Sequence, residues 1–191
     1  AQPNLVRAIL NLHKLYGAQF GRAFLALLKN APKLMEYEGG ILLLAADFAD
    51  KRLSPALQEG IIAQAGKPIE YKGGALQLAV DLTTQRISAP LQAAIVGNCY
   101  ALQDYPGGVV KLAEDISAGR FSESAQVGVV SNLISADAIR KGSVRQYITA
   151  IARIYAVNPV CIEAQFLTDG CDGYRYYTKI LSGDAQLSSL A

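Results

Sequence analysis

Three cysteines are the residues of this chain best suited to chemistry, because a thiol can act as a nucleophile, a metal ligand or an attachment point for a prosthetic group. Cys99, Cys161 and Cys171 are isolated, and none belongs to a CxxC pair. An odd number of isolated cysteines favours neither a disulfide framework nor a zinc site. The remaining interpretations are buried inert thiols, thiol redox chemistry and covalent attachment of a prosthetic group. An inert thiol suits Cys161, at a predicted helix start, better than Cys171, in a polar turn.

Carboxylates accompany two of these cysteines in the sequence. Asp104 follows Cys99 by five residues, and Asp169 and Asp172 flank Cys171. A carboxylate accepts hydrogen bonds from pyrrole N–H groups, as a linear tetrapyrrole would require. We therefore expect these five residues, together with Cys161, to bind a covalently attached cofactor.

Nothing in the sequence indicates a catalytic centre. The single histidine, His13, lies in a predicted helix without an identifiable nucleophile or orienting group, and we interpret it as an ordinary packing or surface residue. The glycines form neither GxGxxG nor GxxxxGK[ST], so no nucleotide-binding loop is predicted. We expect no enzymatic activity and no metal site.

A second possible chemistry is a ladder of charges. Asp47, Asp81 and Asp115 recur at equal spacing, each followed five residues later by an arginine; these are Arg52, Arg86 and Arg120. We expect each arginine to fold back onto the end of its own helix or onto the aspartate. The alternative is that the arginines point outward and contact a partner.

These charges belong to a 34-residue repeat that occurs three times. Tyr37, Tyr71 and Tyr105 each follow an acidic residue and precede, after one residue, a pair of glycines. Self-similarity at a fixed period predicts stacked supersecondary units, here over about residues 36–135. Each tyrosine either closes the joint between units or contributes to a row of aromatic contacts with a partner.

Each unit is predicted to be a helix, a tight turn and a second helix. A serine caps the second helix in every copy, and the glycine pair is expected to end the preceding element. Longer helices flank the repeats, from Pro3 to about Lys29 and from Ser143 to Ala156. We predict an all-α fold, with a helical repeat module over residues 1–139. Residues 140–191 are expected to start a second, truncated module with a loop-rich tail.

Composition narrows the function classes. The 191 residues are 51% hydrophobic and carry a net charge of +2, without a run of basic residues, so nucleic-acid binding is not expected. There is no apolar run of about 18 residues, so membrane insertion is not expected. The chain begins with Ala1, which suggests a processed or trimmed N-terminus.

The Ala-rich, Tyr-rich, Trp-free helical character, with Asn98-Cys99-Tyr100 and Asp169-Gly170-Cys171-Asp172-Gly173, resembles the γ subunit of red-algal phycoerythrin. The resemblance implies a light-harvesting linker of pseudo-repeated helical halves, seated in the cavity of a hexamer of phycoerythrin α and β subunits. It also implies thioether-linked phycourobilin or phycoerythrobilin, or both. The location would be the chloroplast, in the phycobilisome on the stromal face of the thylakoid. The chain is shorter than two full halves, which leaves the number of bilins open.

The second hypothesis is a cofactor-free helical-repeat adaptor that binds a protein or peptide. Its period equals that of tetratricopeptide repeats, but the Trp/Leu-Gly/Tyr pattern of that family is missing. A visible absorption spectrum distinguishes the two hypotheses.

Overall fold

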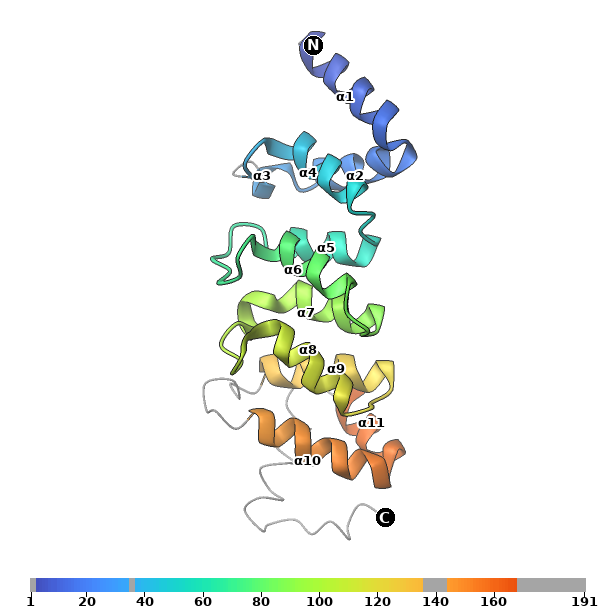
Figure 1. Cartoon of the computed structure of the whole chain (residues 1–191), viewed down its shortest axis with the longest axis vertical. Helices are drawn as coiled ribbons and strands as arrows, with labels where there is room; N and C mark the ends of the chain where they lie inside the picture. Colours follow the sequence, from blue (N-terminus) through green and yellow to red (C-terminus); the bar gives the residue numbers. More distant parts are fainter. Residues whose placement is uncertain (1–2, 35–36, 136–143, 168–191) are drawn as a thin grey trace.

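The computed structural model describes residues 3–34, 37–135 and 144–167. Within these ranges the chain forms eleven helices and no strand, so the predicted all-α class is confirmed (Figure 1). The helices are α1 (Pro3–Tyr16), α2 (Ala18–Leu28), α3 (Ala31–Leu34), α4 (Gly40–Asp50), α5 (Pro55–Ala63), α6 (Gly74–Thr83), α7 (Ala89–Leu102), α8 (Gly108–Ala118), α9 (Glu123–Ser135), α10 (Val144–Val157) and α11 (Pro159–Leu167).

The helices form an elongated arrangement in which packing follows chain order. α5, α7, α9 and α11 pack each on the next, while α6 and α8 pack against α7, and α10 packs against α11 and α8. At the other end, α4 packs mainly on α2, with α1 and α3 beside them. Figure 1 shows the connections α4–α5, α6–α7 and α8–α9 along one edge of the molecule, and the connections α3–α4, α5–α6 and α7–α8 along the opposite edge.

The predicted helix from Pro3 to about Lys29 is two helices. α1 ends at Tyr16 and α2 begins at Ala18, with Gly17 between them at φ 62°. This left-handed backbone is open to glycine and disfavoured for other residues. The backbone at Gly17 therefore breaks the helix that the sequence predicted as continuous.

The glycine pairs begin helices instead of ending them, which corrects the sequence-based assignment. Gly39, Gly73 and Gly107 precede α4, α6 and α8 with φ values of 83°, 87° and 94°. The second glycine of each pair donates its N–H to the carbonyl of the repeat tyrosine at 2.7–2.8 Å, which closes a tight turn. The φ of 83° at Gly39 is a backbone conformation that residues with a side chain rarely adopt, so the turn requires glycine.

The serine caps are confirmed at all three places. The hydroxyl oxygens of Ser54, Ser88 and Ser122 accept hydrogen bonds from the backbone N–H three residues later, at 3.3–3.4 Å. In each copy a glutamine four residues after the serine donates its side-chain amide to the carbonyl just before the serine. The repeated serine therefore satisfies an N–H that a helix start leaves unpaired, and the repeated glutamine satisfies the carbonyl of the residue before the cap.

The last two helices share the core of the preceding ones. Phe166 of α11 meets Phe121 edge-on with a centroid separation of 5.8 Å, and Tyr155 of α10 meets Phe121 at 5.1 Å. Tyr147 of α10 is fully buried in the same core. The expected module boundary at residues 139–140 falls outside the described residues.

Candidate functional site

The repeated tyrosine and aspartate form a hydrogen bond in every copy. The hydroxyls of Tyr37, Tyr71 and Tyr105 donate to Oδ2 of the aspartate ten residues later, at 2.9, 2.6 and 2.5 Å. The aspartate also accepts from a side chain four residues away: Lys51 in the first copy, Gln77 in the second and Lys111 in the third. The tyrosine thus ties the loop before each helix to the C-terminal half of that helix. The contact lies within one copy, so the role of the tyrosines in closing the joint between units stays a prediction.

Burial and this hydrogen bond raise the pKa of all three tyrosines to about 12. Tyr105 is also the most buried of the three, with 2% of its surface exposed. Its partner Asp115 also forms an ion pair with Arg145 at 3.3 Å. Burial alone would raise the pKa of Asp115, but the hydrogen bonds from Lys111 and Tyr105 and the charge of Arg145 outweigh burial and lower it.

Because a tyrosine is the hydrogen-bond partner of each aspartate, the repeat arginines do not take part in this interaction. Arg52, Arg86 and Arg120 are exposed, and among the described residues none of them forms an ion pair with the aspartate five positions earlier. The alternative in which the arginines fold back onto the aspartate is therefore wrong, and the alternative in which they fold back onto the end of their own helix stays a prediction. Arg52 and Arg120 have φ values of 49° and 54°, a left-handed conformation that ends α4 and α8.

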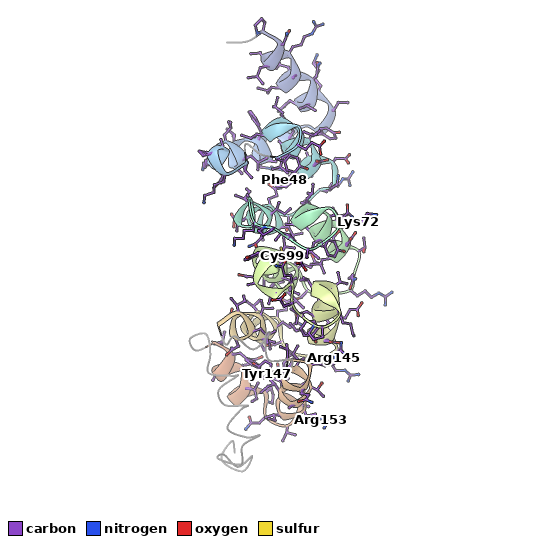
Figure 2. All side chains as sticks on the ribbon, turned by 90° about the vertical axis from the view of Figure 1, so that its left-hand side faces the viewer. Phe48, Lys72, Cys99, Arg145, Tyr147 and Arg153 are labelled. Atoms are coloured by element: carbon purple, nitrogen blue, oxygen red, sulfur yellow. The ribbon has the colours of Figure 1, made fainter. Side chains whose placement is uncertain are left out.

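Arg120 lines a groove between α8 and α10 with a volume of about 780 Å³. Arg145 and Arg153 of α10 lie along the same groove, and Figure 2 shows both on one side of that helix. Ile148 and Ala152 supply apolar surface, so cations border an apolar floor. The carboxylate here, Asp115, is already engaged by three partners. The groove therefore has an excess of positive charge and suits a carboxylate-bearing ligand.

Arg52 lines a second groove, of about 490 Å³, where α2 and α4 meet the start of α5. Phe48, Leu53 and Ile62 form its apolar part, and Arg22 and Glu59 contribute charges. The combination again places an exposed guanidinium beside apolar surface. Two of the three repeat arginines thus stand at grooves of similar chemistry.

Cys99 is fully buried in α7 (0% exposed) and lies between packed helices in Figure 2. Burial raises the pKa of its thiol to about 11, so the reactive thiolate is scarce near neutral pH. Its neighbourhood is held by Gln64 of the preceding unit, whose side-chain amide donates to the carbonyl of Gly97 and accepts from the N–H of Tyr100. Among the three expected cofactor cysteines, this one has the environment of an inert core residue.

The other expected cofactor residues are dispersed or outside the described ranges. Asp104 is exposed in the loop after α7, whereas Cys99 is inside, so the structure does not bring the two into one site. Cys161 lies in the first turn of α11, and its side chain is not described. Asp169, Cys171 and Asp172 lie outside the described residues. In the part of the chain that is described, no group of three potential metal ligands gathers, and no helix is long and apolar enough to span a membrane.

Two features of the structure that were not predicted have clear signals in the sequence. Tyr and Asp stand ten residues apart in every copy, a regularity as strict as the Asp–Arg spacing. Cys99 continues the apolar face of α7 set by Leu91 and Ile95, four residues apart, which is the spacing of a buried helix face. Comparisons with protein-family models, curated proteins and solved structures gave no match to this chain.

Proposed function

We propose that this protein is a non-enzymatic helical scaffold that binds an acidic, extended segment of a partner protein along the edge that carries Arg52, Arg86 and Arg120. The observation that supports this proposal best is the exposure of these three guanidinium groups, since the tyrosines already occupy the aspartates that could have neutralised them. Guanidinium groups bind carboxylates through paired hydrogen bonds and keep their charge at any physiological pH.

The spacing of the arginines sets the form of the ligand. Packed helices lie about 8–10 Å apart, and a chain in the extended polyproline II conformation advances by about 3.1 Å per residue and returns every third side chain to the same face. Carboxylates at every third position of an extended segment would therefore meet successive arginines. Apolar residues between them would fit the grooves beside Arg52 and Arg120.

Fluorescence polarisation tests this proposal with a labelled peptide that has glutamate at every third position. We expect saturable binding that weakens as salt increases, because the contacts are between exposed charges. The variant Arg52→Gln/Arg86→Gln/Arg120→Gln should lose binding. The matched control Lys33→Gln/Lys67→Gln/Lys72→Gln removes three exposed cations near the opposite edge and should retain binding. Equal losses in the two variants would show that net charge, and not the arginine edge, causes binding.

The second candidate is the light-harvesting linker with covalently bound bilins, and the sequence around Cys171 supports it. Asp169 and Asp172 flank that cysteine in a polar segment, which suits attachment of a chromophore. Attachment at Cys99 would require α7 to separate from its neighbours, so this candidate depends on Cys171 and Cys161. Denaturation of native material in acid urea, followed by zinc-induced fluorescence on a gel, should reveal the bilin. A colourless, non-fluorescent band would contradict it.

A further inference from the structure

The first 35 residues differ in charge from the rest of the chain. They contain five of the 18 Lys and Arg residues and none of the 16 Asp and Glu residues. The remaining 156 residues therefore carry an excess of acidic groups. The cations of the first segment are Arg7, Lys14, Arg22, Lys29 and Lys33. A segment that carries cations and no acidic residue has a positive electrostatic potential at its surface, so it attracts anionic surfaces.

The same segment exposes large apolar side chains. Leu10 is 57% exposed, Leu15 73% and Leu25 62%. α1 has no buried residue, although Ile9 and Leu12 pack against the edge of the core. Figure 1 shows α1 projecting from the end of the molecule, so its outer surface is reachable along its length.

Basic and exposed apolar side chains occur together in an eight-residue motif. One copy lies in α1, and the other lies in α2 and the residue that follows it. Residues 7–14 read RAILNLHK and residues 22–29 read RAFLALLK, so Arg, Leu and Lys recur at the first, fourth and eighth positions. These three positions lie on one face of a helix, since 3.6 residues make a turn. All six side chains are exposed: Arg7, Leu10, Lys14, Arg22, Leu25 and Lys29. Each helix thus presents a leucine between two cations, and we call this set the basic–leucine stripes.

We infer that the basic–leucine stripes bind the surface of an anionic lipid bilayer. The leucines would enter the boundary between headgroups and acyl chains, and the long Arg and Lys side chains would reach the lipid phosphates and carboxylates. The helices lie on the surface in this arrangement and do not cross it. This surface shares Arg22 with the groove beside Arg52, but its other five residues do not line that groove, and the inference does not depend on the proposed partner.

The distribution of apolar side chains favours a bilayer over an acidic protein. A helix that binds in a protein groove buries one narrow face. Around the axis of α1, at about 100° per residue, Leu10 and Leu15 lie about 140° apart, which is wider than such a face. Cations lie between them, because Arg7 and Lys14 occupy the intervening arc. A bilayer surface offers negative charge and apolar depth at every point, so it accommodates a broad arc of mixed leucines and cations.

Flotation with vesicles tests the inference on the full chain. The vesicles are phosphatidylcholine alone or phosphatidylcholine mixed with phosphatidylserine. We expect the protein to float with the mixed vesicles only, and to be released by high salt. Arg7→Gln/Lys14→Gln/Arg22→Gln/Lys29→Gln should weaken binding about tenfold or more, and Leu10→Gln/Leu25→Gln should also weaken it clearly. All substituted side chains are exposed, and far-UV circular dichroism checks that each variant is folded.

Control variants distinguish binding by the basic–leucine stripes from non-specific adsorption to the vesicles. Arg86→Gln/Arg120→Gln removes exposed cations elsewhere, and Leu43→Gln/Leu167→Gln removes exposed leucines elsewhere; both should float like the unmodified protein. Loss of peptide binding in the Arg86 and Arg120 variant with intact flotation would separate this surface from the arginine edge. Absence of flotation, equal binding to neutral vesicles, or equal losses in the controls would overturn the inference. Capture of the variant Arg52→Gln/Arg86→Gln/Arg120→Gln by polyglutamate, without flotation on vesicles, would also overturn the inference and would assign the stripes to an acidic protein.

Discussion

Replacing Gly128 by alanine tests how closely α9 and α11 approach each other. A Cβ at this position would lie 2.5 Å from Phe166 Cβ and 2.6 Å from the Phe166 carbonyl oxygen, so backbone must move to admit it. Overpacking of this kind costs about 1–3 kcal/mol, and removing a glycine from a helix interior returns about 0.5–1 kcal/mol. We therefore expect a net loss of up to about 2.5 kcal/mol, which in a chain of this size lowers Tm by up to roughly 10 °C.

Gly97→Ala is the matched control, because this glycine also lies inside a helix that faces a neighbour. Its new Cβ would have only Gly60 Cα nearby, at 3.7 Å, which is ordinary van der Waals contact. The helix preference then dominates, and we expect stabilisation of up to about 1 kcal/mol. Guanidinium unfolding followed by far-UV circular dichroism measures both variants. If the two substitutions shift the midpoint in the same direction and by the same amount, the α9–α11 contact described above is incorrect.

Three further predictions concern the repeat tyrosines, the Cys99 thiol and the buried core. The pKa of Tyr37, Tyr71 and Tyr105 rises from 10.0 to about 12 on folding, so the stability that depends on their protonated hydroxyls is complete below pH 10 and falls as the pH rises towards 12. Replacing all three by phenylalanine should reduce this alkaline loss, measured by urea unfolding at a series of pH values. The Cys99 thiol should react with a disulfide reagent only in denaturant, and fast labelling of Cys99 in the native protein, identified by peptide mapping, would contradict its burial. Leu78→Ala should cost about 2–5 kcal/mol, since Leu78 is fully buried, and a loss below about 1 kcal/mol would show that its face is not in the core.

Local signals in the sequence were sufficient to predict the all-α fold class and the serine caps. The hydroxyl of Ser54 and its equivalents satisfies a backbone group only three residues away, so its role depends on a short stretch of chain. The apolar spacing along each helix likewise requires no knowledge of the neighbours. These features could therefore be predicted without the fold.

The errors arose where the conformation or the choice of partner depends on more than local spacing. Gly39 could end one helix or begin the next, and the tight turn closed by the Tyr37 carbonyl decides between them. Asp47 could accept a hydrogen bond from Arg52 or from Tyr37. In the structure Tyr37 is the donor, and Arg52 adopts a left-handed backbone conformation just after α4. The accessibility of Cys99 depends on the helices that pack around α7, and a single cysteine does not reveal them.

The choice of tyrosine as the partner of each aspartate has consequences for the surface as well as for the core. A phenol can bind a carboxylate while its ring fills apolar space, so one residue closes the loop and satisfies the charge. An arginine of the repeat bonded to that aspartate would have had its charge compensated there, which would have made the outer edge less positive. Since the tyrosine is used, Arg52, Arg86 and Arg120 are free to face solvent at the turns where consecutive helices join. The internal hydrogen bond therefore leaves a cation at each of these turns, and this is why the repeat itself, and not one special residue, defines the proposed binding edge.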